Sequence, residues 1–313
     1  MIKRRELLIG AASASAAAFP VLPNATAQAS ASETAPKTGA RDGFAIALGG
    51  GAAKAFAHIP ILEAMDEMGV QPAEIAGTSM GAILGGLYAS GMSGKDIREY
   101  AVELLTQKTE LFQKLFLSDG KTWSSLLNLV RPAIIEPVVL FETVFPPTLA
   151  ETFSDLRIPM KIIATDFYNQ SQVTLTEGPL LPAIAASSAL PMLLTPVEID
   201  GTVLIDGGFV NPTPFDVFEG SSYYTVGVDV TGTDYTDQQG LPGGLETWIG
   251  SFSITLHSLV SAKLAVSQPD LLIEPPIGSF NTMDFFKIED ILEAAEPARE
   301  EFKRGLDLLL EAR

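Results

Sequence analysis

Residues 77–81 read Gly-Thr-Ser-Met-Gly, a G-x-S-x-G pattern centred on Ser79. This pattern is typical of a serine nucleophile on a sharp turn from a strand into a helix, where a Cβ at Gly77 or Gly81 would clash. The N–H of Met80 then points at the oxyanion that forms when the serine attacks a carbonyl carbon. The pattern alone is common by chance. Here a strand-like run precedes it and a helix-like stretch follows it, which favours acyl transfer.

A glycine-rich loop at residues 49–54, Gly-Gly-Gly-Ala-Ala-Lys, directly follows another strand-like run. Successive glycines let neighbouring N–H groups converge on an anion. A phosphate loop needs Ser or Thr after the lysine, where Ala55 stands, and a dinucleotide loop needs a third spaced glycine that is missing. The loop therefore fits an oxyanion hole better than a phosphate site.

The third candidate is Asp206, which ends the strand-like run 202–205 and precedes Gly207 and Gly208. An aspartate at a strand end beside two glycines is free to point at another group. The alternative interpretation is an ordinary turn aspartate, which is common.

A serine hydroxyl needs a base to take its proton, and that base is most often histidine. The chain has two histidines. His58 follows the glycine loop, and His257 lies among apolar residues, where a structural role is more common. The order Ser79, Asp206, His257 is also that of an α/β-hydrolase triad. A triad and a Ser–Asp pair therefore both remain open from the residues alone.

The three motifs, in this order, resemble the patatin-like phospholipase family. The family pattern has a G-G-G-x-x-[RK] loop, then G-x-S-x-G, then D-G-G. Other stretches also look like family sequence, namely 164–166, 183–191, the Asn-Pro-Thr-Pro of 211–214, and 225–230. The resemblance covers roughly residues 44 to 310. It implies a three-layer α/β/α sandwich with a mostly parallel central sheet.

The resemblance also implies a catalytic assignment. The family uses a Ser–Asp dyad without histidine, so Ser79 would be the nucleophile and Asp206 the base. The implied reaction hydrolyses esters of lipid-like substrates, of the phospholipase A or lysophospholipase type, through an acyl-serine and without metal or cofactor. The implied oxyanion hole comprises Gly50 and Gly51, supported by Gly49, and the Met80 amide. The implied supporting residues are Lys54, Gly77, Gly81, Gly207 and Gly208, and Ala55 departs from the family's usual glycine.

Strand-like runs alternate with helix-like stretches from residue 43 onward, which predicts an α/β fold with a mostly parallel sheet. The expected elements are strands 44–48, 74–78, 160–165 and 225–230, helices 57–68, 80–89 and 180–189, and a hairpin over 197–205 that turns at Asp200-Gly201. An acidic helix pair over 289–310 is expected to break at Pro297. Residues 111–153 fit either a lid with apolar surface or ordinary helical core.

The composition restricts the partners. A formal net charge of −18, from 38 acidic and 20 basic residues, argues against nucleic acid and against purely electrostatic docking on anionic lipid. Apolar, peripheral contact with a membrane stays open. The absence of cysteine excludes disulfides and a cysteine nucleophile. No integral membrane segment is expected in the mature chain.

The N-terminus is typical of an export signal. Lys3, Arg4 and Arg5 precede a weakly apolar, Ala/Ser-rich stretch, and small-x-small sites lie at 25–27 and 27–29. The arginine pair resembles a twin-arginine signal. We expect residues 1–29 to be the signal peptide, 30–42 a disordered lead-in and 43–313 one patatin-like acyl hydrolase domain, in a periplasmic or secreted protein. The alternative is an Ala-rich N-terminal tail or a cytoplasmic amphipathic arm.

Two other functions remain open. One is an α/β-hydrolase-type esterase with the triad of Ser79, Asp206 and His257. The other is a non-catalytic periplasmic module that binds lipid or a partner, against which the intact Ser79 and Asp206 argue.

Overall fold

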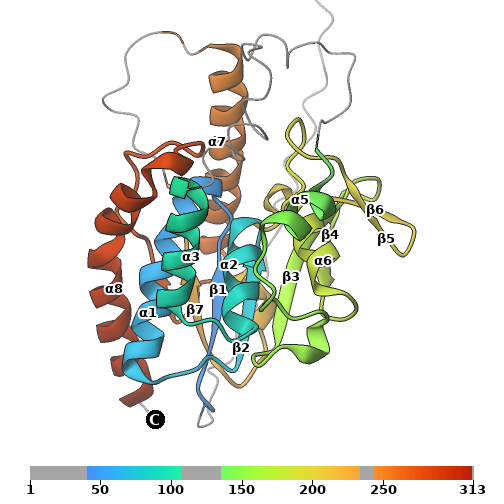
Figure 1. The fold of residues 1–313 in the computed structure, drawn as a ribbon. Helices are drawn as coiled ribbons and strands as arrows, with labels where there is room; N and C mark the ends of the chain where they lie inside the picture. The colour runs from blue at the N-terminus through green and yellow to red at the C-terminus, as the bar shows by residue number, and fades with distance from the viewer. Residues whose placement is uncertain (1–40, 108–134, 233–240, 242, 312–313) are drawn as a thin grey trace, which may run out of the picture. The chain divides into compact units, whose positions relative to one another are not determined.

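The computed structural model describes residues 41–107, 135–232, 241 and 243–311 (Figure 1). The expected signal peptide, most of the expected lead-in, and residues 111–134 of the expected lid or core lie outside these residues.

A mixed, mostly parallel sheet forms the centre of the described structure, with strand order β5-β6-β3-β2-β1-β7-β8 and β4 paired with β3. Its parallel strands are β1 (Phe44–Leu48), β2 (Glu74–Thr78), β3 (Met160–Asp166), β7 (Tyr224–Val228) and β8 (Leu271–Ile273). The antiparallel strands are β4 (Ser171–Leu175), β5 (Val197–Ile199) and β6 (Thr202–Asp206). The carboxyl ends of β1 and β2 consequently meet at one edge, beside the end of β6.

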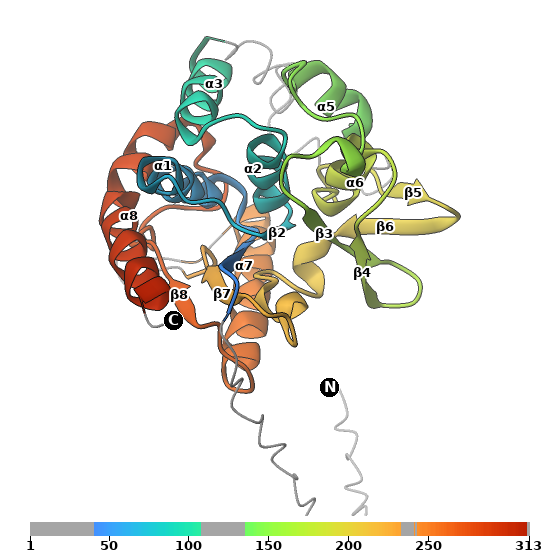
Figure 2. The same cartoon turned by 90° about the horizontal axis from the view of Figure 1, so that it is seen from below.

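Helices cover both faces of this sheet (Figure 2). One face carries α1 (His58–Met68), α2 (Met80–Ala89), α3 (Gly94–Gln107), α5 (Pro137–Val144), α6 (Leu180–Ser187) and α8 (Ile288–Glu311). The other face carries α7 (Gly244–Leu264). Short 3₁₀ segments are η1 (Ala52–Ala57), η3 (Phe153–Asp155), η4 (Gly207–Phe209), η5 (Phe215–Phe218) and η6 (Phe285–Lys287). The expected three-layer α/β/α sandwich is confirmed.

Alternation along β1 shows how the sequence divides the core. Phe44, Ile46 and Leu48 point into the larger apolar cluster on the side of α1 and α2. Ala45 and Ala47 point the other way, toward a small cluster that includes Phe215, Phe218 and Leu264. Because successive side chains of a strand face opposite sides, a fully apolar strand is what a sheet covered on both faces requires.

The structure confirms the predicted hairpin turn but not the predicted helix break. The hairpin turn is confirmed, because Asp200 and Gly201 both have positive φ angles, 50° and 77°, as a type I′ turn demands. The helix break at Pro297 is wrong, because α8 runs continuously from Ile288 to Glu311. Pro297 is exposed, whereas Ala295, on the opposite side of the helix, is buried. The packing of that buried face outweighs the loss of one helical hydrogen bond.

Candidate active site

Ser79 stands at a sharp turn between β2 and α2, with φ 53° and ψ −122°. A Cβ at Gly77 would lie 2.7 Å from the Cα of Ala82, and a Cβ at Gly81 would lie 2.1 Å from the carbonyl oxygen of Leu48. Neither approach tolerates a side chain, so both glycines are needed for the turn. A positive φ at a serine is strained backbone, and such strain gathers at functional sites.

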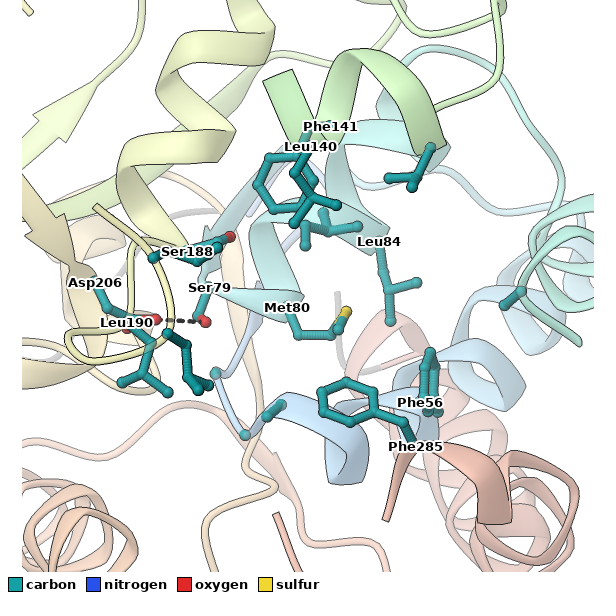
Figure 3. Close-up of a pocket in the computed structure, with 18 of the residues that line it drawn as sticks. Phe56, Ser79, Met80, Leu84, Leu140, Phe141, Ser188, Leu190, Asp206 and Phe285 are labelled. Atoms are coloured by element: carbon teal, nitrogen blue, oxygen red, sulfur yellow. Dashed lines mark hydrogen bonds between the residues drawn. The ribbon is translucent and has the colours of Figure 1, made fainter. Parts of the chain in front are cut away.

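Asp206, at the end of β6, hydrogen-bonds Ser79 directly. Its Oδ2 accepts the Ser79 hydroxyl at 2.7 Å (Figure 3). Its Oδ1 accepts the Gly208 N–H at 2.7 Å. The carboxyl is only 2% exposed. Burial raises the pKa of Asp206 to about 6, although both hydrogen bonds act in the opposite direction. The group is therefore ionised at neutral pH but close to its titration range.

The glycines after Asp206 keep its loop close to the sheet. A Cβ at Gly207 would lie 2.2 Å from the carbonyl oxygen of Ile163 on β3. A Cβ at Gly208 would lie 2.8 Å from Leu256 of α7 and 3.0 Å from Asp206 Oδ1. Both glycines of the D-G-G pattern are therefore required, because a Cβ at either position would clash with its neighbours.

The glycine loop after β1 runs beside Ser79, but its amides are used differently from the sequence prediction. The Gly49 N–H donates to the carbonyl of Val228 (3.1 Å), and the Gly50 N–H donates to the carbonyl of Pro212 (2.8 Å). The Gly50 amide, which the family resemblance places in the oxyanion hole, therefore already donates to a backbone carbonyl in this structure. The physical reason is that neighbouring segments supply carbonyls to these two amides.

Three other amides remain available near Ser79. Gly51, Ala52 and Met80 line the same pocket as Ser79, and no hydrogen bond between described residues engages their backbone N–H groups. Ala52 has a φ of 47°, a strained angle for a residue with a Cβ. Gly51 and Met80 were predicted as oxyanion donors, whereas Ala52 was not, since nothing in the sequence distinguishes this alanine.

Two buried side chains stabilise the glycine loop without lining the pocket. His58 Nε2 donates to the Gly49 carbonyl at 2.7 Å, and burial lowers its pKa to about 4, so it is neutral at pH 7. Lys54 donates to the carbonyls of Thr231, at 3.5 Å, and Gly232. Burial lowers the pKa of Lys54 to about 8, against the opposing effect of Asp229. Both side chains brace the loop and do not line the pocket.

His257 lies away from the Ser–Asp pair. Its side chain is exposed, and its Nδ1 lies 3.5 Å from the Thr231 hydroxyl. It does not line the pocket that contains Ser79. Both carboxylate oxygens of Asp206 already have partners, and neither partner is an imidazole. A triad would need an imidazole between the serine and the aspartate.

The sharp turn at Ser79 between β2 and α2, called the elbow below, has a further anchor that the sequence did not predict. Ser187, at the end of α6, accepts the Ser79 N–H at 2.9 Å through its Oγ and donates to the Ile163 carbonyl at 2.5 Å. It therefore links the elbow to β3. The signal was present, because Ser187 lies within the family-like stretch 183–191, but that stretch alone does not say what the hydroxyl contacts.

A largely apolar pocket opens beside Ser79 (Figure 3). Its wall combines helices from distant parts of the chain. Apolar lining residues are Phe56, Leu84, Leu87, Leu104, Leu140, Phe141, Val144, Leu190, Phe252, Leu256 and Phe285. Helix α5, which lies within the described part of the expected lid or core, thus contributes to this wall.

A family model described as "Patatin-like phospholipase" matches residues 46–219. The chain belongs to the patatin-like phospholipase family. The match includes the glycine loop, the elbow and the D-G-G segment, and it ends before α7.

Curated relatives share the patatin-like region. An uncharacterized NTE family protein of Mycobacterium tuberculosis is 34% identical over 196 residues, which cover 61% of this chain and 49% of that protein. Patatin-like phospholipase domain-containing protein 7 of Rattus norvegicus is 27% identical over 280 residues, covering 80% of this chain and 20% of the relative. The chain therefore spans about half or less of the length of these relatives.

Two solved structures that align with the chain are VipD from Legionella pneumophila and ExoU from Pseudomonas aeruginosa, the latter in complex with SpcU. VipD aligns with a TM-score of 0.46 and 14% identity, covering 85% of this chain and 67% of VipD. ExoU aligns with a TM-score of 0.41 and 17% identity, covering 86% of this chain and 53% of ExoU.

Among the described residues of this patatin-like chain, no group of three or more His, Asp or Glu side chains could hold a metal ion. Within the same residues, no helix combines the length and apolarity needed to cross a membrane.

Proposed function

We propose that the chain is a serine acyl hydrolase that cleaves ester bonds of lipid-like substrates with a Ser–Asp dyad. The observation that carries the proposal is the 2.7 Å hydrogen bond from the Ser79 hydroxyl to the buried carboxylate of Asp206, at the edge of an apolar pocket. Family membership supports the same reaction class.

The geometry supports a two-step reaction. Asp206 takes the hydroxyl proton as Ser79 Oγ bonds to the ester carbon, and the carbonyl oxygen becomes an oxyanion. The N–H groups of Gly51, Ala52 and Met80 stabilise this charge. When the C–O bond breaks, the proton on Asp206 passes to the departing alcohol and an acyl-serine remains. Water then attacks the acyl-serine while Asp206 takes its proton, and this proton passes to Ser79 Oγ as the bond to the acyl group breaks, which releases the fatty acid.

The pocket favours an acyl chain over a polar substrate. Its wall is formed mainly by Leu, Phe and Val side chains, and burial of each methylene is favourable by about 0.8 kcal/mol. The polar site residues, Ser79 and Asp206, lie at one end of it (Figure 3). A phospholipase A or lysophospholipase activity fits this arrangement, because either enzyme holds a single acyl chain beside the ester.

A first experiment tests the nucleophile. The wild-type chain should react with a fluorophosphonate probe at Ser79, and Ser79→Ala should not react while keeping its circular dichroism spectrum. The variant should also lose at least 10³-fold in turnover of an acyl ester. Labelling that persists in Ser79→Ala would place the nucleophile elsewhere.

A second experiment separates the dyad from the triad. His257→Ala should keep activity within a few-fold of wild type, because the structure gives this side chain no contact with Ser79 or Asp206. A triad base would cost on the order of 10⁴-fold or more on removal. Product analysis with mixed phospholipids and lysolipids then distinguishes phospholipase A from lysophospholipase activity. A chain that binds lipids without releasing fatty acid would instead be a binding module.

A further inference from the structure

A short connector, residues Asn211–Thr213, contacts all three catalytic motifs. The N–H of its first residue donates to the carbonyl of Gly207, just after Asp206, at 2.9 Å. The carbonyl of that residue accepts the Thr78 hydroxyl, just before Ser79, at 2.8 Å. The carbonyl of its second residue accepts the Gly50 N–H of the glycine loop at 2.8 Å. The relative positions of the three motifs therefore depend on this connector.

Lys263, in the last turn of α7, hydrogen-bonds to the connector through its ammonium group. Its Nζ donates to Asn211 Oδ1, to the Thr213 carbonyl at 3.3 Å and to Asp216 Oδ1 at 2.6 Å. The ammonium also lies 5.1 Å from the centre of the Phe215 ring. An ammonium has three donors, and here all three go to residues 211–216.

The Asn211 side chain receives a matching set of contacts. Its Nδ2 donates to Asp216 Oδ1 at 2.9 Å and to Gln172 Oε1 of β4 at 2.8 Å. Asn211 is 1% exposed, so its amide depends on protein partners rather than water. Lys263 supplies the donor for its Oδ1, and loss of that donor would leave a buried acceptor unpaired.

We propose, resting on the proposed function, that Lys263 is a positioning residue for ester hydrolysis. Through the connector it fixes the Asp206 loop and the glycine loop relative to Ser79. Lys263 lies outside residues 46–219, which the family model matches. It does not line the pocket, so it acts through other residues and not on the substrate.

The expected kinetic effect falls on kcat. A displacement of about 1 Å between reacting groups can cost about 10²-fold in rate. Lys263→Met keeps the length of the side chain and removes its three donors. We expect this variant to lower kcat by at least about 10-fold, with KM changed less than about threefold because the pocket wall is untouched.

Lys161 offers a matched control on β3. Its ammonium contacts one carboxylate, Glu74 at 2.8 Å, one carbonyl, Val217 at 3.3 Å, and one ring, Phe218 at 5.1 Å. Its exposed side-chain fraction is 25%, against 17% for Lys263. Lys161→Met removes the same kinds of contact but none to the connector, so it should leave kcat within about twofold of wild type.

Hydrogen exchange provides a readout that does not need turnover. The Gly50 amide is protected by its bond to the connector. In Lys263→Met, a peptide covering residues 49–56 should exchange at least about 10-fold faster than in wild type. The same peptide in Lys161→Met should be unchanged, because its lysine does not contact this region.

The outcomes are distinct. Equal kcat in Lys263→Met and wild type, equal loss in both lysine variants, or unchanged exchange of 49–56 would overturn the proposal. If Lys263→Met does not fold, Lys263→Gln takes its place with the same criteria. Asn211→Ala should show a similar loss of kcat. Because both residues act through the same contact, kcat of the double variant should be no lower than that of the less active single variant. A wild type inert toward all esters would contradict the proposed function instead, and the exchange result would still test the connector.

Discussion

At Asp206 the chain buries a carboxyl group that would be more stable in water. The carboxylate accepts two hydrogen bonds, from Ser79 and Gly208, yet burial still dominates and raises its pKa to about 6. A base with a pKa nearer neutrality is a stronger proton acceptor than an ordinary aspartate. The same burial that suits a catalytic base therefore costs folding free energy.

The first prediction concerns the pH dependence of catalysis. Asp206 must be ionised to accept the Ser79 proton, so kcat/KM should fall as pH decreases through about 6. A pH profile with an uncharged acyl ester measures this limb. A limb near pH 4, the range of an exposed aspartate, would show that the base is not this buried carboxyl.

The second prediction concerns stability. The pKa of Asp206 rises from 3.8 to about 6 on folding, so its charge destabilises the folded state above pH 6, and this penalty disappears as pH falls toward 4. Asp206→Asn should therefore abolish turnover yet raise the free energy of unfolding at pH 8 by up to about 3 kcal/mol. Urea unfolding at pH 8 and pH 4 measures it. A gain of equal size at both pH values would contradict this explanation.

At the scale of elements, the elbow between β2 and α2 depends on close backbone approach. Gly81 sits where a Cβ would lie 2.1 Å from the Leu48 carbonyl oxygen, so β1 and α2 are in contact there without a side chain between them. Helix α2 can approach β1 in this way only because its first turn contains glycine. The position of Ser79 beside the glycine loop follows from this contact.

The third prediction tests that contact. Gly81→Ala should destabilise the fold by at least about 3 kcal/mol, because two backbones must separate. Gly250→Ala on α7 is the control, since no heavy atom lies within 4 Å of its added Cβ. That variant should be neutral or more stable by about 0.5–1 kcal/mol, from helix propensity. Thermal unfolding of both proteins compares them, and equal stabilities would refute the steric argument.

The fourth prediction concerns α8. Pro297 is exposed within a continuous helix, where it removes one backbone donor. Pro297→Ala should therefore raise the free energy of unfolding by about 1–3 kcal/mol without changing activity. A lower melting temperature would mean that the proline fixes a bend on which the packing of α8 against α1 depends.

At the scale of the whole molecule, the acidic charge and the N-terminal pattern bear on where the protein acts. The net charge of −18 disfavours electrostatic attraction to anionic lipid, so we expect the proposed lipid ester to be reached through apolar contacts. We propose, from the sequence, that residues 1–29 direct export.

The fifth prediction tests this localisation. Arg4→Lys combined with Arg5→Lys should block export and leave the full-length precursor in the cytoplasm, because a twin-arginine signal requires the arginine pair. Cell fractionation with an antibody against the chain measures the outcome. Undiminished export would indicate a general secretory signal, and absence of processing in the wild type would contradict a signal peptide.

The sequence by itself determined the local features. The G-x-S-x-G pattern predicted the strand-turn-helix at Ser79, and Asp200-Gly201 predicted a type I′ turn, because both depend on steric limits within a few residues. The apolar run Phe44–Leu48 predicted a strand, and the alternation of such runs with helix-like stretches predicted a mostly parallel sheet. These features need no knowledge of distant parts of the chain.

Only the tertiary structure decided which groups meet. The Gly50 amide is occupied because Pro212, far along the chain, brings a carbonyl to it. Pro297 is accommodated because α8 packs along α1, a contact that a local rule for proline does not include. Lys263 contacts Asn211 from α7, which covers the face of the sheet opposite to α1 and α2. Such long-range pairings are set by packing of the whole fold, and for that reason no local sequence pattern contains them.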